Sequence, residues 1–442
     1  MRVRVFVIVA LGSLAWARTT RAQATAEPVA LSVEQAIAKA IETNLTTHLA
    51  QAATTEARGR VLQAAAALLP QLTGSVTQER VFKLNLQAEG FSASPLIGNP
   101  VIGPFNSFDA RIQLVQSLLD TSSIFLTKAA SANSRVARWS EDLAAEQVAS
   151  AAALAYIEDL RAIRDVQDAE TNFALSQKLS TLAHHQHEAG LATAVDMARA
   201  DTRVAVDHQT LIQSDLTAYQ ADLRLKRIVG LPLQTPLTLT DTLDAVPKES
   251  PGEDSALAQA QGDRFELRVT GEELQAERYA LDAARAGFLP TIAARADYGF
   301  SGNTPDSTAR TGSIGGSLDL PLLSGGATLG QIKEARGRKS AAESQYNDIR
   351  IQVEEDVRLA LHTLSAEVDE VKAAETKEQL AERELQLSQN RYTAGVGDNI
   401  QVVTAQASLA DARKSRVDAR ARYADAEANF AAAVGHMRAF HL

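Results

Sequence analysis

The chain has 442 residues, of which 45% are hydrophobic and 22% are charged, and its formal net charge is −10 at pH 7. It contains no cysteine, which excludes disulfides, thiolate metal sites, catalytic thiols and a lipid-modified N-terminal cysteine. Binding to nucleic acid requires clustered Lys and Arg against the phosphates, and this acidic chain lacks such clusters. We therefore expect no nucleic-acid partner.

The first 24 residues are typical of a secretion signal. Arg2 and Arg4 precede an apolar run over 5–17, and Ala22-Gln23-Ala24 has the small-x-small pattern of a signal-peptidase site. A retained anchor helix is the alternative, but the run is short for a bilayer span. We expect residues 1–24 to be removed on export, which leaves a still more acidic chain. No later run of 18 apolar residues occurs, so no transmembrane helix is expected.

Two stretches of the chain predict very long helices. Proline is missing from 105–231 and from 322–442, and the glycine-free parts of these stretches are rich in Ala, Leu, Glu and Gln. We expect continuous helices over 121–188 and 327–393, each about 100 Å long at 1.5 Å per residue. Rods of this length are stable only when they pack side by side, as in a coiled coil.

A shorter helix is expected after each rod, over 194–229 and 399–434. A helix of this length covers about half of a rod. We therefore expect the helix over 194–229 to stack end to end with the helix that precedes Pro70, alongside one long helix.

The chain also repeats itself. Ala66-Ala67-Leu68-Leu69-Pro70 recurs as Ala286-Gly287-Phe288-Leu289-Pro290, and Glu188-Ala189-Gly190 recurs as Thr393-Ala394-Gly395. Two copies of one unit therefore make up most of the chain. The expected divisions are a first copy over 25–230 with a turn over 189–193, a connection over 231–262, a second copy over 263–437 with a turn over 394–398, and a tail over 438–442.

Residues alternate between apolar and polar after each Leu-Pro pair, as in strands. The predicted strands span about 71–83, 107–119, 291–301 and 311–320. Strands of about ten residues cross a bilayer when tilted. Four strands cannot close a barrel, and lipid does not tolerate open edges, so several chains would have to share one barrel of 8, 12 or 16 strands. The alternative is two surface hairpins on a soluble protein.

Several short motifs, in this order, resemble the TolC-like outer-membrane efflux family over residues 30–437. They are Leu31-Ser32-Val33-Glu34-Gln35-Ala36-Ile37, the two Leu-Pro pairs, Asp319-Leu320-Pro321-Leu322-Leu323-Ser324-Gly325-Gly326 and the two Ala-Gly turns. The resemblance implies a mainly α fold with a β-barrel portion. Duplicated long helices would form a coiled-coil tunnel, and each protomer of a homotrimer would add four transmembrane strands to a shared 12-stranded barrel.

The resemblance also implies a function without cofactors. The chain would be the outer-membrane exit duct of a tripartite system, docked through the periplasm onto a membrane-fusion adaptor and an inner-membrane pump driven by protons or ATP. Its cargo would be drugs, dyes or metals, and the alternative cargo is a polypeptide of type I secretion. A periplasmic coiled-coil adaptor is a further alternative, which should have one hairpin flanked by β-rich domains.

In this family the two turns lie at the periplasmic tip, where the tunnel closes and the adaptor docks. The corresponding residues here are Gly190, Thr193, Asp196, Gly395, Asp398, Gln401 and Thr404. Thr193 with Asp196, and Asp398 with Gln401, have capping-box spacing. Alternatively, the acids select cations or hold the gate.

Some members carry two aspartates where this chain has Gln401 and Thr404, which argues against an acidic constriction. We expect Asp398→Ala combined with Gln401→Ala to loosen the closed tip, as an altered single-channel conductance.

The chain has one histidine cluster, formed by His184, His185 and His187. Two of these residues have i, i+3 spacing, which can bind a metal ion on a helix. His187 however aligns with Tyr392 of the second copy, so we expect no metal site. Neither a Gly-x-Ser-x-Gly elbow nor a His-Glu-x-x-His motif occurs, and no enzymatic activity is expected.

Overall fold

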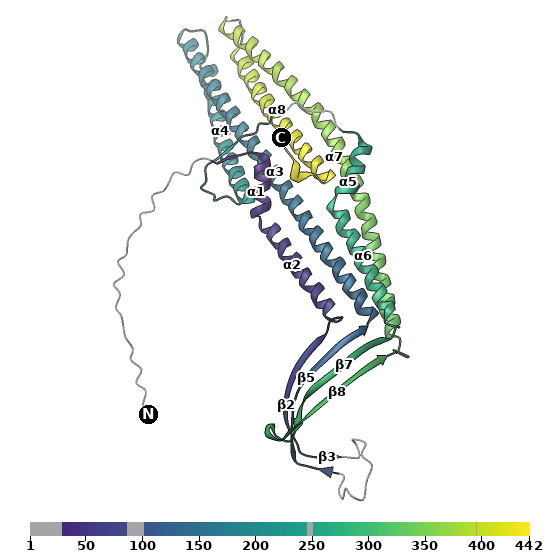
Figure 1. Ribbon diagram of the computed structural model, residues 1–442. Coiled ribbons are helices and arrows are strands. Elements are labelled where there is room, and N and C mark those ends of the chain that lie inside the picture. The colour runs from purple at the N-terminus through teal and green to yellow at the C-terminus, as the bar shows by residue number, and fades with distance from the viewer. Residues whose placement is uncertain (1–28, 86–100, 245–250, 395) are drawn as a thin grey trace, which may run out of the picture.

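The computed structural model describes residues 29–85, 101–244, 251–394 and 396–442. The expected signal over 1–24 and Gly395 lie outside the described residues. Long helices run along one another, and a curved sheet continues from one end of them (Figure 1).

The predicted long and medium helices are present with the expected bounds. The helices are α1 (Val33–Thr43), α2 (Leu45–Ala66), α3 (Thr121–Glu188), α4 (Ala194–Val229), α5 (Glu253–Asp263), α6 (Phe265–Ala286), α7 (Ala327–Thr393) and α8 (Asn399–Val434). Helices α3 and α7 have 68 and 67 residues, and most buried residues of α3 are alanines, which let neighbouring helices approach closely. No helix among the described residues is both long and apolar enough to cross a membrane.

The duplication is visible element by element. Helices α1 and α2 have 11 and 22 residues, as do α5 and α6, and α4 and α8 have 36 each. By this correspondence the second copy begins with α5 at Glu253, before the expected 263, and the expected connection contains both α5 and a short strand. Gly262 lies inside α5, and the helix is held because Ala256 and Ala260 are buried in a cluster with Val353 and Val357 of α7.

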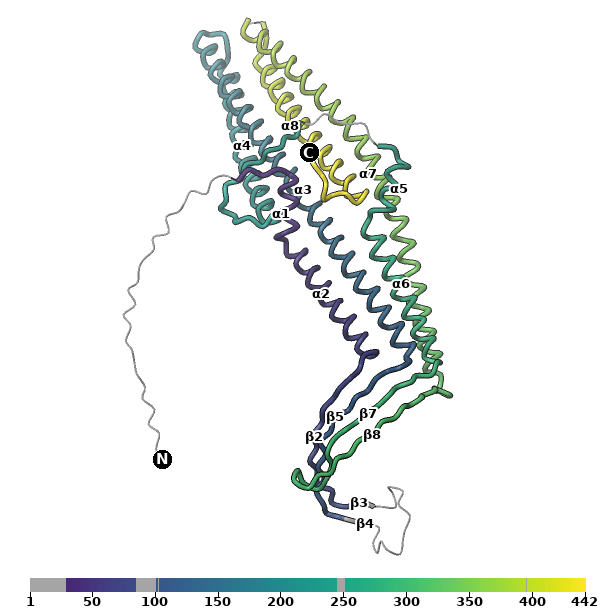
Figure 2. The backbone as a smooth tube through the Cα atoms, viewed as in Figure 1, coloured from purple at the N-terminus to yellow at the C-terminus, as the bar shows by residue number. Residues whose placement is uncertain are grey.

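The shorter helices pack along the rods as the stacking argument predicts. Helices α2 and α4 both pack on α3, with α4 on the half that leads to the tip and α2 on the half that leads to the sheet (Figure 2). Helices α6 and α8 divide α7 in the same way. The alternative of a one-hairpin adaptor is wrong, because two helical hairpins, α3–α4 and α7–α8, stand side by side.

A central cluster holds the middle of the rods. Tyr156 of α3 is fully buried there and donates a hydrogen bond to the carbonyl of Leu31, 2.9 Å away, in the short strand β1 (Val29–Leu31). Strand β1 pairs in parallel with β6 (Leu237–Leu239). The C-terminal residues expected as a tail belong to this cluster, since Phe440 is buried after the 3-10 turn Met437–Ala439.

The two strand pairs form one antiparallel sheet. It consists of β2 (Gln71–Val81), β5 (Phe105–Leu119), β7 (Thr291–Gly302) and β8 (Thr308–Asp319) in that order, and β3 (Leu84–Asn85) pairs with β4 (Val101–Ile102) beyond it. A short 3-10 turn, Pro305–Ser307, joins β7 to β8. The two hairpins join into one sheet, because β5 pairs with β7. Strands β2 and β8 are the edges (Figure 1).

The register separates apolar from polar side chains across all four strands. One row joins Leu72, Leu114, Ala296 and Ile314 on one face, and the row of the adjacent residues joins Thr73, Gln113, Asp297 and Ser313 on the other. On the polar face Arg111 bonds Asp109 beside it and Asp297 of the neighbouring strand, at 2.6 Å and 3.3 Å. Each face of the sheet therefore suits a different medium.

A buried acid between α3 and α4 makes the stability of the fold depend on pH. Asp159 is 3% exposed, and burial, with the charge of Asp222, raises its pKa to about 7, while Lys226 opposes this shift. Since the folded-state pKa is raised, the stabilisation belongs to the protonated form and is lost as pH rises through about 7.

We expect Asp159→Asn to remove much of this pH dependence. The variant should be more stable than the wild type at pH 8 by about 1–3 kcal/mol and similar to it at pH 5. Thermal unfolding of the detergent-purified protein at both pH values measures the difference. Glu188→Gln, at the exposed end of α3, is the control. Equal pH dependence in Asp159→Asn and the wild type would contradict the expectation.

Candidate functional site

The turn between α3 and α4 is built as the sequence predicts. Gly190 has a φ of 75°, the left-handed conformation that ends a helix, and the amide of Leu191 donates to the carbonyl of Gln186 at 2.8 Å. The amide of Asp196 donates to Thr193 Oγ1 at 3.3 Å, and Asp196 Oδ2 accepts from the amide of Thr193 at 2.9 Å. This reciprocal pair is the expected capping box, and it starts α4.

The second turn is built differently. Asp398 Oδ1 accepts from the amide of Ile400 at 3.2 Å, and the amide of Gln401 donates to the backbone carbonyl of Asp398. The expected Asp398–Gln401 capping box is therefore wrong, because the short Asp side chain reaches the residue two positions on. Gln401 and Thr404 are both exposed on α8.

One side chain joins the two turns directly. Asn399 Nδ2 donates to the carbonyl of Asp196 at 2.8 Å, and Asn399 is only 5% exposed. A longer bond, 3.4 Å, runs from Gln186 Nε2 to the carbonyl of Tyr392. The two copies differ at this position, because the first copy has Ala194 where the second has Asn399. This difference could have identified Asn399 from the sequence.

The charge at the first turn is fixed by its hydrogen bonds. The bonds from the Thr193 hydroxyl and amide lower the pKa of Asp196, and Arg199 lies 3.9 Å from it. Burial raises the pKa of Tyr392, and the charges of Asp196 and Asp398 act in the same direction. Each acid lies at a helix N-terminus, where a negative charge is stabilised.

A second connection between the hairpins lies farther along α4. Arg203 binds Asp207 with two nitrogens, at 2.8 Å and 3.0 Å, and Gln406 Nε2 of α8 donates to the same carboxylate at 3.2 Å. Asp207 is 4% exposed, and its burial raises its pKa although Arg203 opposes this. We did not predict this group from the sequence, because its members are adjacent only after α4 and α8 pack.

The three histidines near the first turn do not converge. His184 Nε2 lies 3.1 Å from Asp201, His187 Nδ1 lies 2.8 Å from the carbonyl of Ala192, and His185 is exposed. Within the described part of the chain, no group of three or more His, Cys, Asp or Glu side chains could hold a metal ion.

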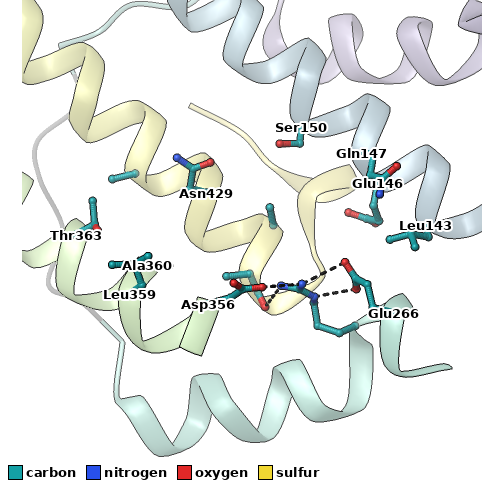
Figure 3. Close-up of a pocket in the computed structure, with 14 residues that line it drawn as sticks. Leu143, Glu146, Gln147, Ser150, Glu266, Asp356, Leu359, Ala360, Thr363 and Asn429 are labelled. Atoms are coloured by element: carbon teal, nitrogen blue, oxygen red, sulfur yellow. Dashed lines mark hydrogen bonds and ion pairs between the residues drawn. The ribbon is translucent and has the colours of Figure 1, made fainter. Parts of the chain in front are cut away.

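A hollow of about 500 Å³ lies at the middle of the rods, between α3, α7 and α8 (Figure 3). Arg264, just before α6, binds Glu266 at 2.9 Å and Asp356 at 3.0 Å on its wall. Glu146 of α3 also lines the hollow; it accepts from the amide of Met437 at 3.0 Å, and burial raises its pKa. These charged groups are paired with protein groups, so they fasten the start of α6 to α7 and the C-terminal turn to α3.

Asn399→Ala is expected to loosen the tip. The substitution removes the bond to the carbonyl of Asp196, and a hydrogen bond of this kind contributes about 0.5–1.5 kcal/mol. The form in which the two turns have separated should gain up to about tenfold in population. Single-channel recording in planar bilayers should show a larger mean conductance, with Gln386→Ala at an exposed position of α7 as the control. Identical recordings for Asn399→Ala and the wild type would rule out this role.

The overall arrangement matches solved channel structures. The fold superposes on the outer membrane protein VceC of Vibrio cholerae with a TM-score of 0.78 at 20% identity, over 91% of this chain and 96% of that chain. It superposes on the CmeC outer membrane channel of Campylobacter jejuni with a TM-score of 0.80 at 18% identity, over 91% and 85% of the two chains. The predicted fold class, helical tunnel segments continued by barrel strands, is therefore confirmed.

The sequence comparisons agree with the fold. Residues 256–436 match the family described as outer membrane efflux protein. Outer membrane protein OprJ of Pseudomonas aeruginosa is 27% identical over 284 residues, which are 60% of this chain and 58% of OprJ. Outer membrane protein TolC of Vibrio cholerae is 24% identical over 270 residues, which are 59% and 61% of the two chains. The chain is therefore similar to TolC-like outer membrane efflux proteins, and the alignments span about half to three fifths of these relatives.

Proposed function

We propose that the protein is the outer-membrane exit duct of a tripartite efflux system. The observation that carries the proposal is the sheet, which has one apolar and one polar face and two open edges, and which continues directly into helices about 100 Å long. In lipid the edges β2 and β8 must be paired, and further copies of the chain supply the partners. Three copies give the 12-stranded barrel implied by the resemblance.

The helices would then extend through the periplasm and end in the two turns. On this proposal, the periplasmic adaptor docks at the tip formed by Gly190, Thr193, Asp196, Asp398, Gln401 and Thr404, and the bond from Asn399 to the carbonyl of Asp196 holds the tip closed. An inner-membrane pump supplies the energy. The duct passes small molecules such as drugs, dyes or metals and performs no chemistry.

The absence of cysteine allows a direct test of the shared barrel. Thr73→Cys in β2 and Ser313→Cys in β8 place one thiol on each edge strand, on the same face. A short bis-maleimide should yield dimers and trimers of the full chain from outer membranes, and the protein should leave the membrane with detergent but not with salt. Thr73→Cys alone is the control. Exclusive monomers, or release by salt, would contradict the proposal.

Polypeptide export is a second candidate because of one comparison. The alkaline protease secretion protein AprF of Pseudomonas aeruginosa is 26% identical over 237 residues, which are 52% of this chain and 49% of AprF. A disruption strain separates the two cargoes. Efflux predicts greater sensitivity to drugs, dyes or metals with unchanged exoproteins, whereas polypeptide export predicts the loss of a secreted protein.

A further inference from the structure

Two arginines interrupt the apolar face of the sheet at the end remote from the helices. Arg310 of β8 shares a row with Phe300 of β7 and Val76 of β2 through the register. Arg80 of β2 lies on the same face, because it follows Val76 by four residues and alternate residues of a strand share a face. Both side chains are exposed, and neither bonds a charged partner among the described residues.

The position of these arginines along the sheet matches the edge of a lipid layer. Arg310 lies eight residues from Leu318, the apolar residue nearest the helices on β8, which is about 27 Å along a strand. At a strand tilt of about 40° this corresponds to about 21 Å of height, close to the roughly 25 Å apolar band of such barrels. An arginine on a lipid face is strongly unfavourable at mid-depth and nearly neutral at the interface.

Aromatic residues mark the same level. Phe300 lies beside Arg310, and Tyr298 packs on Phe300 with a centroid distance of 6.4 Å. Phe108 lies one row farther from the helices on the same face. Aromatic side chains form girdles at membrane interfaces, so this row locates the interface independently of the charges.

We propose that Arg80 and Arg310 bind the phosphate groups of an anionic lipid in the outer leaflet of the membrane. The planar guanidinium presents paired donors that match phosphate oxygens. The inference rests on the proposed function, which places the apolar face in lipid and the end of the sheet remote from the helices at the outer leaflet. In a closed barrel, β8 of one protomer also pairs with β2 of the next. Arg310 of one copy and Arg80 of its neighbour then face the lipid from adjacent strands, and each seam carries one such pair.

The test uses the detergent-purified full protein and two lipids. Bisphosphorylated lipid A and chemically dephosphorylated lipid A are titrated separately, and bound lipid is counted by native mass spectrometry. Each arginine is expected to contribute about fivefold in apparent Kd, so Arg80→Gln with Arg310→Gln should weaken lipid A binding about 25-fold. Dephosphorylated lipid should bind the wild type and the variant equally weakly, and inorganic phosphate should not displace lipid A.

Arg295→Gln is the matched control, because Arg295 is an exposed arginine of β7 on the opposite, polar face. It should bind lipid A like the wild type. Three results would each overturn the inference: unchanged binding by the double variant, an equal loss in Arg295→Gln, or displacement of lipid A by inorganic phosphate. If the oligomer is still intact in detergent, such a result leaves the proposed function standing. A protein that stays in solution without detergent and binds neither lipid would overturn the proposed function as well.

Discussion

Replacing Ile314 with arginine is expected to block assembly of the sheet in the outer membrane. Ile314 is 88% exposed in the single chain and lies in the middle of the apolar face, in the row of Leu72 and Leu114. A cationic side chain at the middle of a lipid-facing strand destabilises a barrel by about 2–4 kcal/mol, and each copy in an oligomer adds this amount. The amount of heat-resistant oligomer in outer membranes, resolved on gels, should fall severalfold.

The neighbouring residue provides the control. Ser313 lies on the opposite face of the same strand and bonds Asp297, so Ser313→Arg introduces the same charge beside an acid on the polar face. It should assemble like the wild type. If both variants assemble equally well, or if both fail, the assignment of the apolar face to lipid is wrong.

Arg203→Gln is expected to cause the largest loss of stability among the helical variants. It leaves the buried Asp207 carboxylate with only the neutral side chains of Gln406 and Ser176 as partners, and removing one member of a buried ion pair destabilises by about 3–5 kcal/mol. Burial already raises the pKa of Asp207, and losing Arg203 raises it further. Protonation then relieves the buried charge, so the loss should be smaller at pH 5 than at pH 8.

Chemical denaturation at the two pH values measures this effect. Arg199→Gln, on the same helix, removes an exposed arginine 3.9 Å from Asp196, and such a surface pair contributes about 0–1 kcal/mol. A loss in Arg203→Gln no larger than in Arg199→Gln would show that the buried group does not hold α4. A loss that grew towards low pH would contradict the assigned charge of Asp207.

Local chemistry was sufficient to predict the helices and strands. The absence of proline, and of glycine over most of their length, located α3 and α7, and Thr193 with Asp196 located the start of α4. Alternation located the strands and the faces they present. These features depend on residues a few positions apart, so they can be inferred without knowledge of the packing.

The remaining features depend on contacts between distant parts of the chain. Helix α5 contains Gly262, so its sequence resembles that of a connecting loop. The helix forms because its alanines are buried against α7. The pairing of β5 with β7 joins two hairpins into one sheet, and its register sets which residues of the two hairpins lie in one row on the same face. The tip illustrates the same point, because Asn399 bonds the carbonyl of Asp196, 203 positions away, and Gln406 bonds Asp207, 199 positions away.

By itself, therefore, the sequence determined the lengths of the rods, the four strands and the duplicated order, because helix and strand preferences act over a few residues. Only the tertiary structure decided which polar side chains hold the two hairpins together and which rows of the sheet form one surface. Such side chains find their partners only after burial removes water and the helices and strands come into register.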